Sequence, residues 1–178
     1  CIPGTIAGGI VMNSGCYGSD ISKIVLSISV IDMNGEIKII NNKDINFSYR
    51  KSSLTKNQII TNIEMKGSFL KKEKVIEIMR NLKNKKDFEQ PQKIKTGGST
   101  FKNPRDSDKK AWQLIKESGC ADLRVGGIKL SKLHCNFLEN LDGATSEDAE
   151  NLIENIKQQV FKKTNINLEL ELEVVGKK

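Results

Sequence analysis

Aromatic residues and histidine are scarce in this chain, which argues against two kinds of site. Aromatics make up 5% of the 178 residues, and a single histidine is present. Proteins that bind single-stranded nucleic acid interleave aromatic side chains with basic clusters. Here the lysines are scattered, so the net charge of +7 indicates a lysine-rich solvated surface or attraction of a small anionic substrate. We therefore expect no nucleic-acid partner.

Cysteines are few and do not have the spacing of a metal site. The four are Cys1, Cys16, Cys120 and Cys135, and no two of them form a CxxC pair. With one histidine, His134, the chain lacks the ligand set of a zinc centre. Free thiols are typical of a reducing compartment, so we expect a cytoplasmic protein without bound metal.

Long apolar runs and targeting signals are missing as well. No run approaches the roughly 20 apolar residues that cross a bilayer. The first residues have neither the basic start nor the apolar core of a signal peptide. We therefore expect no membrane partner. With 37% hydrophobic and 29% charged residues, the composition is that of a globular protein with one large or two small domains.

Period-2 patterns dominate the first third of the chain. Two apolar runs joined at Asn34-Gly35 predict a β-hairpin within residues 23–42. Residues 45–50 (INFSYR) and 57–67 (NQIITNIEMKG) favour two further strands.

Residues 69–88 change to helical period, which predicts an amphipathic helix. Pro91 and the pair Gly97-Gly98 interrupt this pattern. We therefore predict a domain boundary near residue 90, with one domain over 1–90 and another over 91–178.

Two helices and a strand are predicted in the second domain. A short helix over 109–119 ends at Gly119. A longer helix over 143–165 begins with Thr145 as N-cap and Asp148 three residues later. Residues 166–175 alternate strictly between apolar and acidic side chains, which predicts a strand. Helices and hairpins without β-α-β order favour the α+β class.

Two glycine-containing stretches offer backbone that can approach a ligand. Residues 1–18 are rich in glycine, whose amides can face a phosphate or a flat ring. The stretch has neither a Walker motif nor a GxGxxG fingerprint, and a plain turn between strands is the alternative. Ser99 follows Gly97-Gly98, with Lys102 and Asn103 close behind. A serine beside glycine also serves simply as a turn former.

Other candidate residues carry charge. Arg50, next to Tyr49, suits bidentate capture of a carboxylate or phosphate, and a surface ion pair is the alternative. The acidic side chains of residues 166–175 fit a solvated strand face, and the alternation does not choose among Glu169, Glu171 and Glu173. His134 lies in a glycine-containing turn that leads into a strand. It fits a hydrogen-bonded structural role better than a catalytic one.

Five motifs in this order resemble the UDP-N-acetylenolpyruvoylglucosamine reductases, the MurB flavoenzymes of peptidoglycan synthesis. They are IPGTIAGGIVMNSGCYG, Tyr49-Arg50-Lys51-Ser52, GSTFKNP, RVGGIKLSKLHCNF and LELELEVVG. The resemblance spans essentially the whole chain and is to the shorter subtype of the family. It implies the C-terminal part of a VAO/PCMH-type FAD-binding domain, followed by a small α+β substrate-binding domain. An N-terminal portion that precedes these motifs in the family is expected to be absent here.

The resemblance also implies cofactors and site residues. NADPH reduces FAD, and the reduced FAD reduces UDP-N-acetylglucosamine enolpyruvate to UDP-N-acetylmuramate. The implied FAD-binding residues are Ile2, Pro3, Gly4, Thr5, Gly8, Gly9, Asn13, Gly15, Tyr17 and Gly18. The implied catalytic residues are Ser99, which protonates the substrate, and Arg50 and Glu171, which polarise the enolpyruvyl group and stabilise its enol. The implied substrate-binding residues are Tyr49, Lys102 and Asn103.

Two positions depart from the family pattern. Glu173 stands where the family commonly has arginine, and Cys1 stands where it usually has glycine. We expect a monomeric oxidoreductase. The alternatives are a non-catalytic remnant that binds the UDP-sugar but not FAD, and a small basic nucleic-acid-binding protein.

Overall fold

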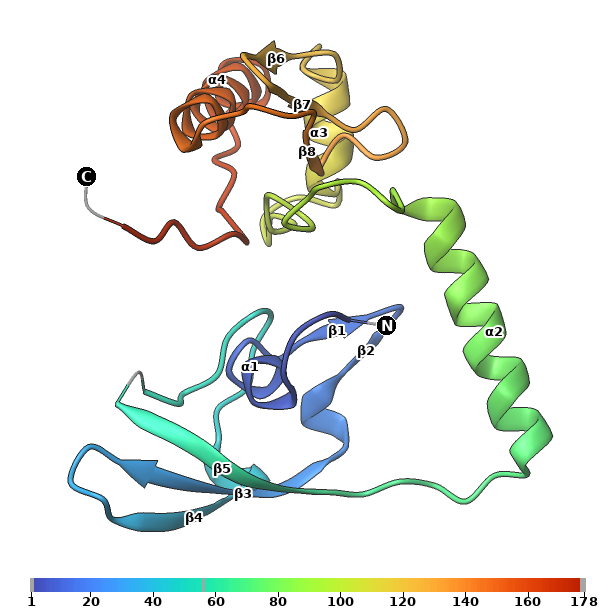
Figure 1. Cartoon of the computed structure of the whole chain (residues 1–178), viewed down its shortest axis with the longest axis vertical. Coiled ribbons are helices and arrows are strands. Elements are labelled where there is room, and N and C mark those ends of the chain that lie inside the picture. Colours follow the sequence, from blue (N-terminus) through green and yellow to red (C-terminus); the bar gives the residue numbers. More distant parts are fainter. Residues whose placement is uncertain (1, 56, 177–178) are drawn as a thin grey trace. The chain divides into compact units, whose positions relative to one another are not determined.

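The computed structural model describes residues 2–55 and 57–176 (Figure 1). The chain divides into two compact units, Cys1–Ile76 (unit 1) and Glu77–Lys178 (unit 2). Both combine helices with antiparallel sheets, and neither has β-α-β order, so the α+β class is confirmed. The division falls inside helix α2 (Lys72–Glu89). This helix confirms the one predicted over 69–88.

Unit 1 contains a three-stranded antiparallel sheet of order β4-β3-β5. Its strands are β3 (Val25–Asp32), β4 (Ile37–Asn41) and β5 (Gln58–Met65). The hairpin predicted at Asn34-Gly35 is confirmed, because β3 pairs with β4 and Gly35 has a φ of 84°. The Asp32 carboxylate accepts hydrogen bonds from the amides of Asn34 and Glu36, which fixes the turn.

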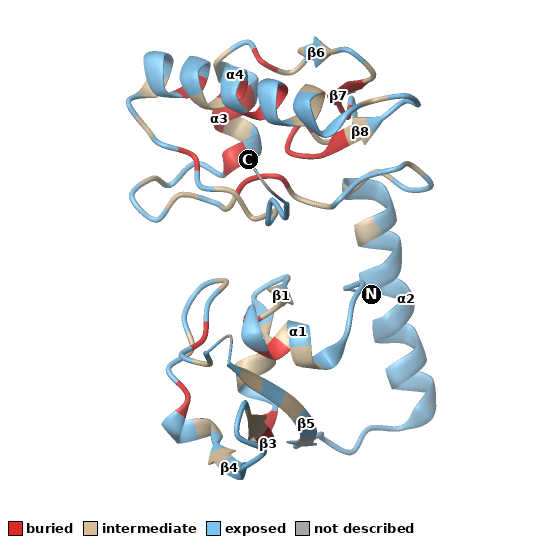
Figure 2. Ribbon diagram, turned by 60° about the vertical axis from the view of Figure 1, so that its left-hand side comes forward, coloured by how far each residue is buried: buried red, intermediate tan, exposed pale blue. Residues whose placement is uncertain are grey.

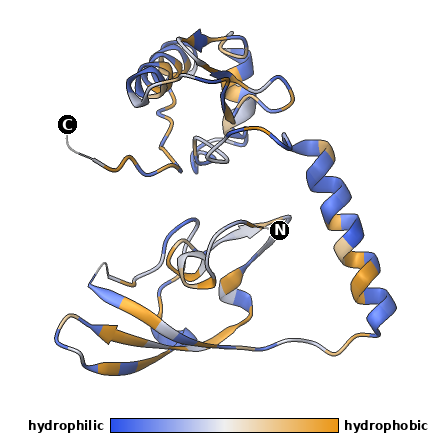
Figure 3. Cartoon of the chain, in the orientation of Figure 1, coloured by the Kyte–Doolittle hydropathy of each residue, from blue (hydrophilic) through white to orange (hydrophobic). Residues whose placement is uncertain are grey.

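One face of this sheet packs into a small core, shown by the red segments in Figure 2. Strand β3 supplies Val25, Ile28 and Val30, which meet Ile10 of α1 (Ile6–Val11) and Ile45. Apolar residues also occur at exposed positions of β4 and β5 (Figure 3). The sheet therefore has one buried face, formed where the glycine-rich segment packs against it.

The strand predicted over residues 45–50 is wrong. Ser48 and Lys51 exchange main-chain hydrogen bonds of 2.9 and 3.2 Å, which closes a tight turn around Tyr49 and Arg50. Ile45 is buried because it packs into the core of unit 1, not because it lies in a strand. Residues 45–50 therefore alternate between apolar and polar side chains although they form a loop.

Unit 2 is built around a small sheet and two helices. The sheet has the order β6-β7-β8, with β6 (Arg124–Val125), β7 (Ile128–Leu130) and β8 (Leu138–Asn140). Helices α3 (Ala111–Glu117) and α4 (Ser146–Thr164) confirm both predicted helices. Leu114, Leu152 and Ile156 from these helices are buried in one cluster with Phe101.

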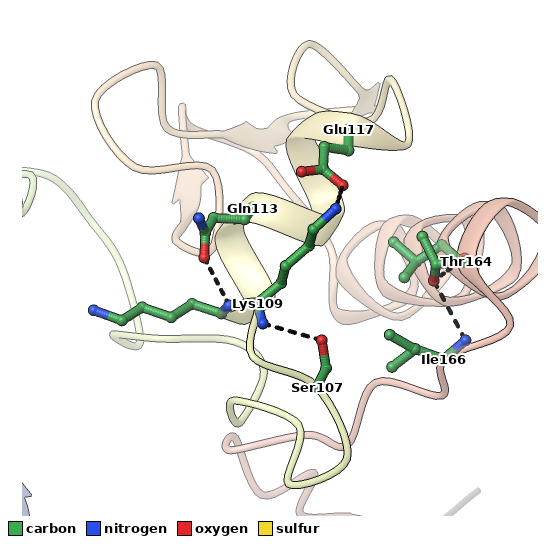
Figure 4. Close-up of polar contacts among 8 residues, drawn as sticks. Ser107, Lys109, Gln113, Glu117, Thr164 and Ile166 are labelled. Atoms are coloured by element: carbon green, nitrogen blue, oxygen red, sulfur yellow. Dashed lines mark hydrogen bonds and ion pairs between the residues drawn. The ribbon is translucent and has the colours of Figure 1, made fainter.

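Short polar contacts organise the chain around these helices (Figure 4). Ahead of α3, the Ser107 hydroxyl accepts a hydrogen bond from the Lys109 amide at 3.1 Å, and Lys109 Nζ lies 2.7 Å from the Glu117 carboxylate. At the last residue of α4, the Thr164 hydroxyl accepts from the Ile166 amide at 3.3 Å. These contacts direct the chain into and out of the helices.

The strand predicted over residues 166–175 is also wrong. The segment bends at residues 171–172 and forms one isolated bridge, between Leu170 and Phe101. The predicted alternation holds in part, because Leu168 is buried and Leu170 and Leu172 pack against the same core. Two main-chain hydrogen bonds, from the Lys102 amide to the Glu169 carbonyl and from the Glu171 amide to the Thr100 carbonyl, join this segment to the neighbouring one.

The predicted N-cap of α4 is confirmed. The Thr145 hydroxyl accepts from the Asp148 amide at 3.0 Å, and the Asp148 carboxylate accepts from the Thr145 amide at 3.0 Å. The hydrogen bond from the Thr145 amide is the main cause that lowers the pKa of Asp148 below its ordinary value.

Replacing Asp148 by asparagine is expected to lower stability at neutral pH and to matter less in acid. A lowered folded-state pKa stabilises the protein above the ordinary value of 3.8, and this contribution is lost as the pH falls through the folded-state pKa. Urea unfolding of both proteins at pH 7 and pH 3 measures the difference. Glu147→Gln, in the same helical turn, is the control that leaves the capping bonds in place. If Asp148→Asn changed the free energy of unfolding equally at pH 7 and pH 3, the stabilising role of the ionised Asp148 carboxylate would be contradicted.

Candidate functional site

The glycine-rich segment folds into a short helix and a tight hairpin. The Thr5 hydroxyl caps α1 by accepting from the Gly8 amide at 3.1 Å. Strands β1 (Gly15–Cys16) and β2 (Ser19–Asp20) then pair around Tyr17 and Gly18, whose φ angles are 52° and 80°. Positive φ at both central residues matches a type I′ turn. The helix was not predicted, because glycine is a poor helix former and two glycines lie inside it.

Residues 2–18 form a largely exposed surface without charged side chains. Exposed or half-buried members of the predicted FAD set are Ile2, Pro3, Gly4, Thr5, Gly8, Gly9, Gly15, Tyr17 and Gly18. Ile6, Val11 and Met12 add exposed apolar area. An uncharged surface of small and apolar residues suits a flat ring, and main-chain amides at its glycines can approach a phosphate. Cys1, where the family usually has glycine, lies outside the described residues.

Three side-chain hydrogen bonds join this segment to the turn that carries Arg50. Asn13 Nδ2 donates to the Ser48 carbonyl at 3.0 Å, and the Ser52 hydroxyl donates to the Val11 carbonyl at 2.9 Å. Arg50 Nη2 donates to the Gly15 carbonyl at 3.0 Å. The first and second motifs, 35 or more residues apart in sequence, therefore form one site in unit 1.

Arg50 has an unusual backbone conformation. Its φ is 53°, and its guanidinium carbon lies 4.9 Å from the centre of the Tyr49 ring. A left-handed conformation costs a non-glycine residue roughly 1–2 kcal/mol. Such strain persists where the surroundings fix the geometry, and it gathers at functional sites. A purely surface ion pair would not need this conformation.

In unit 2, the segment that carries Ser99 lies between two others. Half-buried Ser99 bridges to Phe137, and the Thr100 amide donates to the Asn136 carbonyl at 2.8 Å. From the C-terminal segment, the Glu171 amide donates to the Thr100 carbonyl at 2.8 Å. Ser99 and Glu171, 72 positions apart by their numbers, are thereby held beside the same residue.

Asn136 is a residue of this site that sequence reasoning missed. It is 4% exposed, its Oδ1 accepts from the Phe101 amide at 3.0 Å, and its Nδ2 donates to the Phe101 carbonyl at 2.8 Å. The amide side chain thus replaces a strand neighbour and fixes the Ser99 segment. An asparagine among otherwise apolar residues after His134 was the available signal, because a buried amide needs partners.

His134 has the structural role that was predicted. Its Nδ1 accepts from the Asn136 amide at 3.3 Å, and its ring packs edge-on against Phe137 at 4.9 Å. Burial is the main cause that lowers the pKa of His134 below its ordinary value. A neutral ring in this place supports the loop that carries Asn136.

The two predicted substrate-binding residues that follow Ser99 also have partners within unit 2. Lys102 Nζ lies 3.6 Å from the Glu169 carboxylate, and the Lys102 amide donates to the Glu169 carbonyl. Asn103 Oδ1 accepts from the Ala111 amide at 3.0 Å, at the start of α3. Both residues therefore help to hold the site, whatever they bind.

The glycine pair of the RVGG motif has a packing reason. A Cβ on Gly127 would lie 2.7 Å from the Ala144 nitrogen and 2.8 Å from the Asp142 oxygen. Gly126 has a φ of 49°, and a Cβ there would meet the Asp148 carboxylate. This turn therefore packs against the capped start of α4.

Thr100→Val is expected to stabilise unit 2. The Thr100 side chain is fully buried, and its hydroxyl has no hydrogen-bond partner among the described residues. Removing an unpaired buried hydroxyl at nearly constant shape should raise the free energy of unfolding by about 1 kcal/mol. Urea unfolding measures the change. Thr100→Ser, which keeps the hydroxyl and loses the methyl group, should destabilise, and a destabilised valine variant would contradict the reading.

Residues 2–55 and 57–176 offer neither a metal site nor a membrane-spanning helix. Within these ranges, no group of three or more His, Cys, Asp or Glu side chains could hold a metal ion. Over the same ranges, no helix is both long and apolar enough to cross a membrane.

Comparisons with known proteins find similarity to the same reductases that the five motifs resemble. Residues 90–175 match the family model of the UDP-N-acetylenolpyruvoylglucosamine reductase C-terminal domain. Reductases of this name from Pelagibacter ubique and Wolbachia pipientis are 44% and 42% identical over 176 residues, which is 98% of this chain. A solved structure of the Thermus caldophilus reductase (MurB) superposes on 97% of this chain with a TM-score of 0.84 and 30% identity.

The matches cover only part of those proteins. This chain spans 58% and 59% of the two relatives and 60% of the solved chain.

Proposed function

Because the chain belongs to the UDP-N-acetylenolpyruvoylglucosamine reductase family, we propose that it carries the substrate-protonating part of a UDP-N-acetylmuramate dehydrogenase. The reaction reduces the enolpyruvyl double bond of UDP-N-acetylglucosamine enolpyruvate during peptidoglycan synthesis. The observation that carries the proposal is the hydrogen bond from the Glu171 amide to the Thr100 carbonyl, which holds the Glu171 main chain next to the residue that follows Ser99.

We assign residues 1–90 to the C-terminal part of a VAO/PCMH-type FAD-binding domain and residues 91–178 to a substrate-binding domain. The family match that begins at residue 90 supports this division, whereas the two compact units divide earlier, after Ile76. The exposed, uncharged surface of residues 2–18 fits FAD, and the named members of that segment would hold it. Flavin bound there and reduced by NADPH would supply the hydride.

The residues of this chain then stabilise and protonate the negative charge that hydride addition creates. Addition to the double bond leaves an enolate, whose negative charge develops beside the substrate carboxylate. Arg50 suits a developing anion because its guanidinium is permanently charged and its turn is fixed. Ser99 donates the proton that converts the enolate into product. Glu171 helps to polarise the enolpyruvyl group, and Tyr49, Lys102 and Asn103 bind the rest of the substrate.

Titration of the 178-residue chain with UDP-N-acetylglucosamine enolpyruvate tests the proposal. We expect weak binding by calorimetry, and NMR shift changes at Ser99, Thr100 and Glu171. FAD alone should bind weakly and leave the purified protein colourless, because the chain spans about three fifths of its relatives. Absence of UDP-sugar binding at millimolar concentration would contradict the proposal.

A remnant that binds the UDP-sugar without FAD is the alternative function. Joining this chain to the part of the Pelagibacter ubique relative that the match leaves out separates the two. A joined protein that holds flavin and turns over supports the enzyme, whereas one that binds only the UDP-sugar supports the remnant. We expect a monomeric cytoplasmic protein, which light scattering and cell fractionation can test.

A further inference from the structure

Asn13 uses its side chain on two main-chain segments of unit 1. Its Nδ2 donates to the Ser48 carbonyl at 3.0 Å, and its Oδ1 accepts from the Ser22 amide at 3.3 Å. The residue is 5% exposed and has a φ of 42°, a conformation that asparagine tolerates better than most residues. Little of this side chain is left for a ligand to touch.

The Ser48 carbonyl is the group on which the Arg50 turn closes. It accepts from the Lys51 amide at 3.2 Å as well as from Asn13. Arg50 lies inside this turn in its left-handed conformation, and its guanidinium reaches the Gly15 carbonyl. A carbonyl that accepts two hydrogen bonds fixes the turn more firmly than one that accepts only from within it.

We propose that Asn13 is a positioning residue for Arg50 rather than a contact of the cofactor. The proposal rests on the proposed function, in which Arg50 stabilises the enolate. Ser52 anchors the end of the same turn to Val11, so the turn is held at both sides by the glycine-rich segment. Loss of the Asn13 bond frees one side, and Arg50 can relax to an unstrained backbone.

Two substitutions and a matched control test this on the 178-residue chain. Asn13→Asp keeps the size and the acceptor but cannot donate to Ser48. Asn13→Gly removes the side chain and tolerates the positive φ. The control is Asn42→Asp. Asn42 is a half-buried amide of the same unit whose Nδ2 donates to the Ser22 and Val25 carbonyls at 2.7 and 2.9 Å, away from the Arg50 turn.

The first measurement is the NMR signature of the Arg50 backbone. Its Cα and Cβ shifts and its amide–Hα coupling report whether φ is positive. Both Asn13 variants should lose the left-handed signature, while Asn42→Asp should keep it. A folded Asn13→Gly variant that keeps this signature would overturn the proposal.

The second measurement uses the joined enzyme described under the proposed function. Asn13→Gly should lower kcat roughly 10- to 100-fold, as expected for misplaced catalytic groups. The affinity for FAD should stay within about twofold, and the loss should vanish in an Arg50→Ala background. A loss of FAD affinity equal to the loss of rate would instead make Asn13 a cofactor contact. If Arg50→Ala itself leaves turnover intact, the proposed function fails and the NMR result still stands.

Discussion

Ser99→Ala in the joined enzyme is expected to leave flavin reduction by NADPH near the wild-type rate and to slow product formation by roughly 10²–10⁴-fold. Flavin reduction needs no proton on the substrate carbon, so it should not depend on this hydroxyl. Product formation requires the enolate to be protonated. The bridge to Phe137 holds Ser99, and the Glu171 amide is bound to the carbonyl of the next residue, Thr100. Stopped-flow reoxidation by the UDP-sugar, with product quantified, separates the two steps.

Two further variants sharpen this result. Ser99→Cys should keep part of the rate, because a thiol can also donate a proton. Ser107→Ala is the matched control, since it removes a hydroxyl of the same unit that only accepts from the Lys109 amide. If Ser99→Ala forms product as fast as the Ser107 variant, Ser99 is a turn residue and not the acid.

Phe101→Ala should destabilise unit 2 by roughly 3–5 kcal/mol, the largest stability effect that we expect. The Phe101 side chain is 1% exposed in the centre of the unit 2 core, while its main chain is held on both sides by the Asn136 amide. The variant loses the buried ring and leaves a cavity among helix and sheet residues. Urea unfolding followed by the fluorescence of Trp112, the single tryptophan, reports this unit.

Phe69→Ala is the control for this prediction. Phe69 is the same residue type, but its side chain is fully exposed. The substitution should change the free energy of unfolding by less than about 0.5 kcal/mol. Equal effects of the two substitutions would mean that Phe101 does not belong to the core.

Local signals identified the elements that depend on local interactions. The hairpin at Gly35 and the capping box of Thr145 and Asp148 are specified by a few neighbouring residues, so the sequence was sufficient to find them. The α+β class followed from helices and hairpins without β-α-β order, and the order of the five motifs pointed to the reductases that this chain is similar to.

Contacts between distant residues decided what the sequence could not predict. The segment of Ile45 and the segment of Leu170 both alternate like strands, but each lacks a neighbouring strand to pair with over its length. Short helix α1 contains two glycines, and the cap on Thr5 and the burial of Ile10 outweigh their low propensity.

The site residues show the same contrast between local signals and distant contacts. All five, Ser99, Arg50, Glu171, Asn136 and Asn13, stand in the motifs, but the positioning roles of the two asparagines depend on hydrogen bonds to main chain 35 positions away. A single sequence does not show which carbonyl an amide will meet. Such residues become visible only when the turns that they hold are in view.

The cysteines give this chain an internal measure of local opening. Cys120 and Cys135 are buried in unit 2, so an alkylating reagent reaches them only when that core opens. Burial is also the main cause that raises the pKa of both thiols, which lowers their reactivity further. Cys16 lies exposed in the unit 1 hairpin and reacts at once. Mass spectrometry of peptides after timed alkylation therefore yields the opening free energy of one unit without a signal from the other.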